Sequence, residues 1–223
     1  MLDRGINKYM IDLNVLAETL FQGDIFQVRE MTQKALGENI EPKEILEQGL
    51  IKGMEIIGRK FKNNEIFLPE VLLASQAMYA GMGILQPELT KSGIRAIGKV
   101  LIGTIKGDLH DIGKNLVAMM LKGGGFEIVD LGIDVSPEKF LRSVIEHQPE
   151  ILGMSSLLTT TMGGMKEVID ILEIKDLRNK VKIIVGGVSV SKDFAEEIGA
   201  DGYAPDAASA VDVAKELIKS LRR

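Results

Sequence analysis

Apolar side chains recur every three or four residues through residues 1–88, and this spacing predicts helices without strands. Gly23 and Gly37 each end an apolar stripe, as glycines after helices do. Asp24 is a typical N-cap, and Pro42 and Pro69 suit the first turns of helices. Four helices with short connections predict a small bundle. The expected inward-facing positions are Leu13, Leu16 and Leu20, then Ile25, Val28, Met31 and Ala35, then Ile45, Leu46, Leu50, Met54 and Ile57, and finally Leu72, Met78, Met82 and Leu85.

Two glycines and three methionines in residues 1–88 indicate how the predicted helices pack. Gly49 and Gly53 share one helix face and would let another helix approach closely, although loose packing is the alternative. Met54, Met78 and Met82 are expected in the core, because methionine commonly fills irregular gaps.

The hydrophobic period changes after the polar stretch 86–93, which contains a proline and a glycine and is the best candidate for a linker. We therefore expect a helical domain over 1–88, a linker over 89–98 and an α/β domain over 99–223. Strands are expected at 99–104, 127–131, 151–155, 181–185 and 201–203, and helices at 114–122, 137–147, 162–173, 193–198 and 207–221. Five strands alternating with helices predict a doubly wound parallel sheet in the flavodoxin-like order.

Composition describes a globular protein whose 223 residues suffice for one large domain or two small ones. No cysteine is present, which excludes disulfides and thiolate chemistry and fits a reducing cytoplasm. Residues 1–88 carry 9 basic and 13 acidic side chains and residues 89–223 carry 18 and 19, so neither part has the charge of a nucleic-acid binder. We expect that no stretch approaches the length of a membrane span, and residues 1–10 lack the apolar core of a signal peptide.

Candidate chemistry lies in residues 107–115, after the first expected strand, where open α/β sheets place their ligands. His110 is on this loop, and Asp108 is close enough to accept a hydrogen bond from one ring nitrogen and leave the other free. Five residues separate Gly107 from Gly113 and Asn115 stands in the Ser/Thr place, so the stretch is not a P-loop. The Rossmann glycine pattern is absent too.

A single histidine limits the kind of metal site that this loop can form. Ordinary zinc and iron sites need three or four protein ligands, and the only other histidine is His147. One imidazole suffices only when the metal arrives with its equatorial positions filled, as in a macrocycle. A surface histidine near a helix N-terminus is the plainer alternative.

Two further loops follow strands on the same side of the expected sheet. Residues 155–161 carry a run of hydroxyls after the third strand, and Gly186 and Gly187 follow the fourth. Hydroxyls can bind a polar ligand, and paired glycines let the backbone approach a bulky group closely. Each signal is weak alone, because such runs are also common in caps and turns.

The combined spacing resembles the fingerprint of cobalamin-binding domains that hold the corrinoid with its nucleotide tail displaced. Asp108-x-His110-x-x-Gly113 is followed after 41 residues by Ser155-x-Leu157 and after 28 more by Gly186-Gly187. Residues 67–71 and the helix after them resemble the helical cap that precedes this domain in methionine synthase and in small methyltransferase corrinoid proteins. The resemblance covers nearly the whole chain, and no catalytic barrel is present.

The resemblance implies roles for individual residues. His110 would be the lower axial ligand of cobalt, in the base-off/His-on form. Asp108 would hydrogen-bond His110, and Thr161 would hydrogen-bond Asp108 at the position where methionine synthase has a serine. We call this chain of hydrogen bonds the His110 relay. The cap would shield the upper face of the corrin, with some of Met54, Phe67, Met78 and Met82 in contact, and residues 86–98 would act as a hinge. The cofactor-binding residues implied are Asp108, Leu109, His110, Asp111, Ile112, Gly113, Ser155, Leu157, Thr159, Thr161, Gly186 and Gly187.

The function implied is that of a corrinoid methyl carrier in a cytoplasmic methyltransferase system. Its partners would be a substrate:corrinoid methyltransferase, a methylcorrinoid:tetrahydrofolate or coenzyme M methyltransferase and a reductive activase, with methylcobalamin as the intermediate and neither nucleic acid nor membrane involved. The alternatives are the cobalamin subunit of a radical mutase or aminomutase, a cobalamin sensor, and a receiver or flavodoxin-like module without cobalamin.

Overall fold

The computed structural model describes residues 11–222, so the expectation about a signal peptide in residues 1–10 lies outside the described residues. The chain forms two compact units, Met1–Arg95 and Ala96–Arg223, which we call the helical unit and the α/β unit. The boundary between them falls inside the stretch 89–98, where we expected the linker. The preceding helix continues through Pro87 to Lys91, so the first residues of that stretch are helical.

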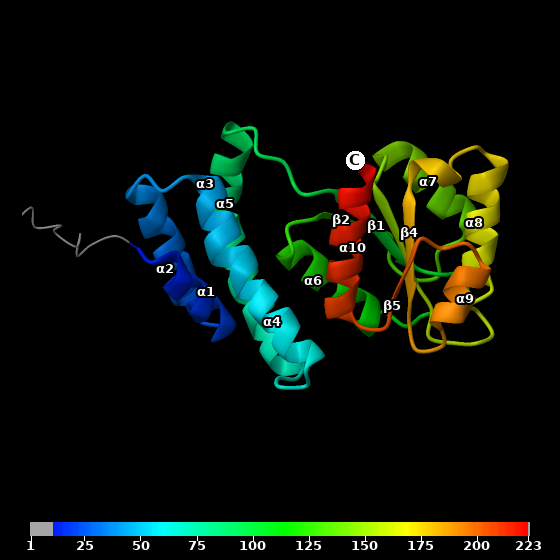
Figure 1. The fold of residues 1–223 in the computed structure, drawn as a ribbon, viewed down its shortest axis with the longest axis horizontal. Coiled ribbons are helices and arrows are strands. Elements are labelled where there is room, and N and C mark those ends of the chain that lie inside the picture. The colour runs from blue at the N-terminus through cyan, green and yellow to red at the C-terminus, as the bar shows by residue number, and fades with distance from the viewer. Residues whose placement is uncertain (1–10, 223) are drawn as a thin grey trace, which may run out of the picture. The chain divides into compact units, whose positions relative to one another are not determined.

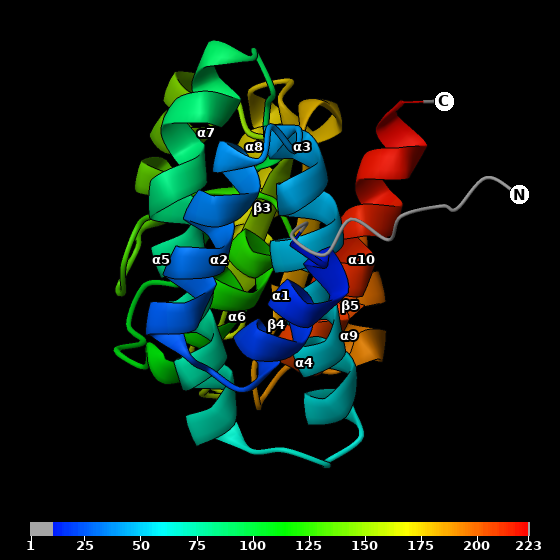
Figure 2. The same cartoon turned by 90° about the vertical axis from the view of Figure 1, so that its left-hand side faces the viewer.

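Over its described residues, 11–95, the helical unit contains four helical segments, as expected. They are α1 (Leu13–Phe21), α2 (Ile25–Gly37), a continuous segment of α3 (Pro42–Glu44), η1 (Ile45–Ile51) and α4 (Lys52–Lys62), and α5 (Leu68–Lys91). Asp12 and Asp24 cap α1 and α2 by accepting the amide hydrogens of Asn14 and Gln27. Helix α2 packs beside α5 and α1 beside η1 and α4 (Figures 1 and 2).

The close approach that Gly49 and Gly53 allow is made by α1. A Cβ on Gly49 would lie 2.6 Å from a methyl carbon of Leu16, and one on Gly53 would lie 3.0 Å from the carbonyl oxygen of Ala17. The segment η1 that contains Gly49 is a π-helix, which the periodicity did not predict. Both glycines therefore leave room for the backbone and side chains of α1.

Burial in the helical unit corrects two of the expected inward-facing positions. Ile25 and Leu72 are exposed, whereas the polar Thr32 is fully buried one residue after Met31. Met54 and Met78 are buried, which confirms them as core residues and leaves them no surface to offer a ligand. Phe67 is 66% exposed and stays a candidate for contact with a cofactor.

Helix α5 corrects the expectation that no stretch approaches the length of a membrane span. Its 24 residues are long and apolar enough to cross a membrane by length and composition, and 39% of that window is buried inside the structure. The buried residues include Val71, Ala74, Met78 and Leu85, which recur at helical spacing. This is the pattern of a core helix packed against its neighbours, here α2 and α4.

The α/β unit confirms the expected fold. Its strands are β1 (Lys99–Thr104), β2 (Glu127–Asp130), β3 (Ile151–Ser155), β4 (Lys182–Gly186) and β5 (Gly202–Ala204), all parallel in the order β2-β1-β3-β4-β5. The helices are α6 (Ile112–Gly123), α7 (Pro137–His147), α8 (Gly164–Ile174), α9 (Lys192–Glu197) and α10 (Ala207–Leu221), with a short 3₁₀ turn η2 (Arg178–Lys180). Helices α6 and α10 cover one face of the sheet and α7, α8 and α9 the other (Figure 1).

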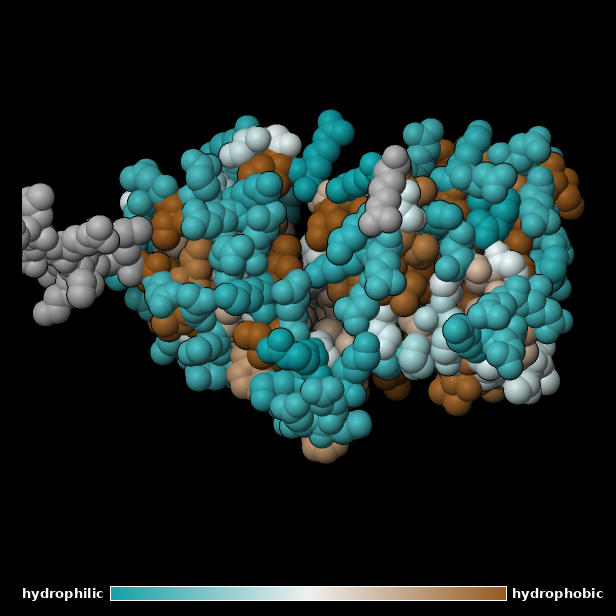
Figure 3. Space-filling view, viewed as in Figure 1, coloured by the Kyte–Doolittle hydropathy of each residue, from teal (hydrophilic) through white to brown (hydrophobic). Residues whose placement is uncertain are grey.

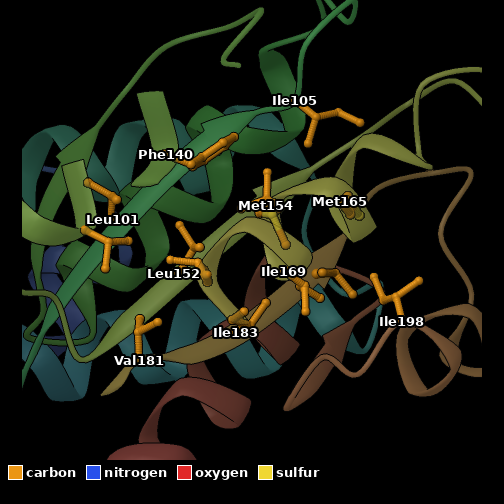
Figure 4. Packing of buried hydrophobic residues seen from close by; sticks show 14 of the residues in the cluster. Leu101, Ile105, Phe140, Leu152, Met154, Met165, Ile169, Val181, Ile183 and Ile198 are labelled. Carbon is orange, nitrogen blue, oxygen red and sulfur yellow. The ribbon is translucent and has the colours of Figure 1, made fainter. Parts of the chain in front are cut away.

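Side chains of the strands and of α7, α8 and α9 form the core on one side of the sheet. Phe140 of α7 is fully buried, and its ring occupies the space that a side chain at Gly103 of β1 would need, 2.9 Å from the Cβ position. Leu152, Met154 and Ile183 lie in the same cluster with Met165 and Ile169 of α8 (Figure 4). The core fixes the strands, so that the loops at their carboxyl ends share one edge.

Charged residues lie on the outer faces of these amphipathic helices. Hydrophilic side chains cover much of the face that Figure 3 shows, with hydrophobic ones between them. At the opposite edge of the sheet, Asp201 accepts hydrogen bonds from Arg178 and Lys182 and from the amide of Ile183, which ties β4 to the start of β5.

Candidate functional site

The loop between β1 and α6 carries the predicted histidine, and it is held from two directions. Thr104, the last residue of β1, donates its hydroxyl to the carbonyl oxygen of His110 at 2.9 Å. Gly107, which has a φ of +82°, donates its amide hydrogen to Asp134 Oδ1 at 2.7 Å. The amide of Asp134 donates in turn to the carbonyl oxygen of Asp108. The loop after β2 thus supports the loop after β1.

Asp108 is fully buried, and each of its carboxylate oxygens faces a different partner. Oδ1 accepts the amide hydrogen of His110 at 3.0 Å and lies 2.7 Å from the ring Nδ1 of the same residue. Oδ2 accepts the amide hydrogen of Leu157 at 2.7 Å and that of Leu158 at 3.4 Å. One carboxylate therefore joins the loop after β1 to the loop after β3.

The hydrogen bonds keep this buried carboxylate ionised. Burial alone would raise the pKa of Asp108, but the amide hydrogens of His110 and Leu157, the His110 ring and the amide of Leu158 together lower the pKa to about 2. An ionised carboxylate can only accept, so at neutral pH the proton between the two side chains belongs to Nδ1 of His110. The histidine tautomer follows from this contact.

His110 itself is half-exposed, with 53% of its side chain accessible. With Nδ1 facing Asp108, the other ring nitrogen, Nε2, is left with its lone pair and no hydrogen bond to any part of the chain that the structure describes. This is how a metal-ligating imidazole is usually oriented by a carboxylate.

Two hydroxyls surround Oδ2 of Asp108, where we expected one. Thr161 Oγ1 lies 3.4 Å from Oδ2, in the place predicted for the end of the relay. Ser156 Oγ lies at the same distance, and 3.1 Å separates the two hydroxyl oxygens. Ser156 belongs to the run of hydroxyls but is not among the predicted site residues. Its burial was the missing signal, because Ser156 is fully buried whereas Thr161 is only partly so.

The paired glycines at the end of β4, Gly186 and Gly187, approach other backbone atoms. A Cβ on Gly187, which has a φ of +124°, would lie 1.9 Å from the carbonyl oxygen of Ser156. A Cβ on Gly186 would lie 2.6 Å from the carbonyl oxygen of Ala204. The pair is therefore required where the end of β4 meets the loop after β3 and the end of β5. The predicted contact with a cofactor tail remains a prediction.

Large apolar side chains are exposed around this edge of the sheet. Each loop after β1 to β4 contributes one, and the first residue of α6 adds another. They are Leu109 and Ile112, which are 67% and 73% exposed, then Ile133, Leu158 and Val188. Exposed apolar patches, especially those rimmed by polar residues, mark interaction or ligand-binding surfaces. Leu109 and Ile112 flank the histidine in sequence and were predicted to bind the cofactor.

The remaining predicted site residues occupy the same edge with different surroundings. Asp111 accepts a hydrogen bond from Asn115 and precedes α6. A Cβ on Gly113 would meet no atom within 4 Å. Ser155 accepts the amide hydrogen of Ile105 through its carbonyl oxygen. Thr159 lies exposed on the loop after β3.

A buried lysine in the same motif was not predicted to matter. Lys114, whose side chain is 2% exposed, donates through Nζ to Asp130 Oδ2 at 2.5 Å and to Asn115 Oδ1 at 2.6 Å. Asp130 also accepts the amide hydrogen of Gly132. This ion pair joins the first turn of α6 to the end of β2.

The donor set fits a cofactor that brings its own equatorial ligands. Within residues 11–222, His, Cys, Asp and Glu side chains form no group of three that could hold a metal ion. The site offers one imidazole nitrogen, a buried carboxylate behind it and an apolar surround. A corrinoid needs one axial ligand and presents a large, partly apolar ring, so these residues fit the group.

Comparisons with known proteins show the family to which this chain is related. A family model described as a B12 binding domain matches residues 98–212, and a second model with the same description matches residues 13–86. A corrinoid protein of Desulfitobacterium hafniense strain Y51 is 41% identical over 209 residues, which cover 92% of this chain and 97% of that protein. Dimethylamine corrinoid protein 3 of Methanosarcina acetivorans is 39% identical over 206 residues, which cover 92% of this chain and 96% of that protein.

A solved structure matches over both units. It is the methanol:cobalamin methyltransferase complex MtaBC of Methanosarcina barkeri, at a TM-score of 0.82 and 33% identity, covering 93% of this chain and 79% of that chain. The α/β unit contains the first family match, and the helical unit contains the second. This chain therefore belongs to the family of corrinoid proteins and is built from a B12-binding domain preceded by its helical partner domain.

Proposed function

We propose that this protein is a corrinoid methyl carrier of a methyltransferase system and that His110 ligates cobalt through Nε2, with the nucleotide tail of the cofactor displaced. The observation that carries the proposal is the contact of 2.7 Å between His110 Nδ1 and the buried Asp108 carboxylate. It fixes the tautomer that leaves Nε2 available on a half-exposed ring.

The chain's own residues have distinct tasks in this proposal. When bound, the corrinoid supplies a cobalt atom that accepts a methyl group from one enzyme and gives it to another. Asp108 orients His110 and makes its imidazole a stronger donor. Thr161 hydrogen-bonds Oδ2 of Asp108, the carboxylate oxygen that does not face the His110 ring. The apolar side chains of Leu109 and Ile112 bind beside the corrin ring and reduce its contact with water.

The displaced tail requires space between the loops at the carboxyl edge of the sheet. Gly113, Ser155, Leu157, Gly186 and Gly187 are the residues assigned to it, on the family fingerprint. The open space around the Cβ position of Gly113 supports its part in this assignment. Phe67, exposed at the start of α5, is the residue that we assign to contact with the upper corrin face.

The partners follow from the relatives. Corrinoid proteins for dimethylamine and trimethylamine match this chain at about 40% identity, and MtaBC is a complex with a methyltransferase. We assign to this protein a methylamine:corrinoid methyltransferase as donor partner, a methyltransferase for tetrahydrofolate or coenzyme M as acceptor partner, and a reductive activase, all in the cytoplasm. The match over both units favours a carrier over a mutase subunit, because a mutase does not need the helical unit.

The axial ligand is tested by electron paramagnetic resonance of the Co(II) form. Protein labelled with ¹⁵N-histidine should show a doublet hyperfine splitting from one axial nitrogen, where unlabelled protein shows a triplet. His110→Ala should abolish the dependence on the label, and His147→Ala, which replaces the only other histidine, should keep it. A label-dependent pattern that survives in His110→Ala would show that the axial assignment is wrong.

The carrier role is tested with labelled methyl donors. Reduced holoprotein mixed with a dimethylamine or trimethylamine methyltransferase should acquire labelled methyl from the matching amine at one per chain. Failure to acquire methyl with any amine, methanol or methyl ether system would refute the carrier role.

The role of Asp108 is tested separately. The variant Asp108→Asn should bind more cobalamin in the His-off form, and its cobalt should be reduced to Co(I) at a less negative potential.

A further inference from the structure

The hydroxyl of Ser156 has a place in the His110 relay that the family fingerprint does not assign. Ser156 is fully buried, so its hydroxyl must find its partners within the protein. Three oxygens lie within reach: Thr161 Oγ1 at 3.1 Å, the carbonyl oxygen of Leu158 at 3.2 Å and Asp108 Oδ2 at 3.4 Å. Ser156 therefore faces the same carboxylate oxygen as Thr161.

The two hydroxyls lie at nearly the same distances from the same two acceptors. Thr161 Oγ1 lies 3.1 Å from the carbonyl oxygen of Leu158 and 3.4 Å from Asp108 Oδ2, within 0.1 Å of the corresponding distances for Ser156. Each hydroxyl carries one proton, and the ionised carboxylate and the carbonyl are acceptors only. Whichever hydroxyl donates to Asp108, the other can donate to Leu158, and no distance favours either arrangement.

We infer that Ser156 is a second positioning residue of the histidine relay and that it can replace Thr161 as the hydroxyl donor to Asp108. This inference rests on the proposed role of His110 and adds to it. The relay has two alternative donors at its end, so the loss of one hydroxyl leaves Asp108 with the other. A hydrogen bond to a charged group is worth more than one to a carbonyl, so the remaining proton goes to the carboxylate.

Ser156 also connects the relay to the glycine turn after β4, which Thr161 does not. Its amide donates to the carbonyl oxygen of Gly186, and its carbonyl oxygen accepts from Ser189 Oγ at 3.3 Å. The same carbonyl oxygen fills the space beside Gly187. The backbone of Ser156 is thus held by the end of β4 and the turn after it, which supports the position of its hydroxyl without help from Thr161.

Substitutions that remove one hydroxyl or both test the inference. Thr161→Val keeps the shape of the side chain, and Ser156→Ala removes little volume. Each single variant should change the affinity for cob(II)alamin and the His-on fraction by less than about threefold. The double variant S156A/T161V should lose about tenfold or more, since the removal of such a supporting partner typically costs ten- to a hundred-fold. The effect of the pair would then exceed the product of the single effects.

A conservative variant separates the hydroxyl from the packing around it. In S156A/T161S, the serine at position 161 has the hydroxyl that valine lacks but not the methyl group of threonine. Affinity for cobalamin and the His-on fraction should therefore return to the level of Ser156→Ala. Ser143→Ala, which removes another buried serine hydroxyl in α7, is the control and should leave both unchanged. If Thr161→Val alone gives the full loss, or if the single effects simply multiply, Ser156 is not a second donor.

A measurement on the apoprotein makes this failure distinguishable from that of the proposed function. The ¹⁵N resonances of the His110 ring report which nitrogen carries the proton at neutral pH. The parent and both single variants should be protonated at Nδ1, and S156A/T161V should show an increased share of the Nε2–H tautomer. Should the double variant keep the parent's tautomer and the parent's affinity, the inference is refuted. If the parent itself does not bind cobalamin through His110, the proposed function fails instead.

Discussion

The carbonyl oxygen of Ser156 occupies the place where a side chain on Gly187 would begin, because a Cβ there would lie 1.9 Å from it. The φ of +124° at Gly187 is, in addition, a conformation that residues with side chains rarely adopt. The loops after β3 and β4 are therefore in backbone contact, and the glycine at this position is a requirement of the fold. Contact of Gly187 with a cofactor would be a second role, in addition to this structural one.

We expect Gly187→Ala to lower the free energy of unfolding of the α/β unit by about 3 kcal/mol, because both the backbone strain and the overlap with Ser156 must be relieved. Urea unfolding followed by circular dichroism measures the loss. Gly113→Ala in α6 is the matched control, since a Cβ there meets no atom within 4 Å. Equal stabilities of the two variants would mean that the two loops can separate freely.

Gly113→Ala should separate folding from binding. Alanine is favoured over glycine inside a helix by roughly 0.5–1 kcal/mol, so the apoprotein should be as stable as the parent or slightly more so. If the corrinoid lies against Gly113, as the fingerprint implies, the added methyl group must weaken cobalamin binding, by an amount that titration followed by absorbance measures. Unchanged affinity would place Gly113 outside the contact surface.

The alternation of strands and helices could be predicted because each strand is a short buried run bounded by turn residues. The starts and ends of β1, β3, α7 and α10 agree with the structure. Asp108 and His110 could be paired because two residues of spacing suffice for a side-chain contact. The contact with the hydroxyl of Thr161, 53 residues away, followed from family resemblance alone.

The contacts that the sequence did not predict depend on three-dimensional packing. Ser156 and Thr161 are equivalent in a run of hydroxyls until burial separates them. Asp134 follows a different strand from Asp108, and only the pairing of β1 with β2 brings its carboxylate to Gly107. The π-helix over Ile45–Ile51 has no signal in a hydrophobic period that is close to that of an α-helix.

Asp108 should make the stability of the apoprotein depend on pH. Its pKa is lowered from 3.8 to about 2 in the folded protein, so its ionisation stabilises the fold above pH 4 by about 2 kcal/mol. That contribution is lost as the pH falls from about 4 towards 2. The difference in unfolding free energy between the parent and Asp108→Asn should therefore be largest above pH 4 and shrink below it. A constant difference across this range would show that the Asp108 carboxylate is not ionised preferentially in the fold.

The ion pair between Lys114 and Asp130 should respond unequally to the loss of either partner. The Lys114 side chain is 2% exposed, whereas that of Asp130 is 39% exposed. Asp130→Asn leaves a buried ammonium group without a counter-charge, which typically costs about 3–5 kcal/mol. Lys114→Met keeps an apolar chain of similar length in the buried position and leaves the Asp130 carboxylate to water, so its cost should be about 1 kcal/mol or less.

Urea unfolding of Asp130→Asn and Lys114→Met at neutral pH measures the free energy that each variant loses, and Asp130→Asn should lose more. Lys192→Met is the control, because the pair of Lys192 with Glu196 is exposed on both sides and should contribute less than about 1 kcal/mol. Adding Lys114→Met to Asp130→Asn should restore most of the stability that Asp130→Asn loses, since no buried charge then remains. If the double variant is as unstable as Asp130→Asn alone, the cost comes from the bond of Asp130 to the amide of Gly132 and from the loop after β2, and the buried charge of Lys114 is not its cause.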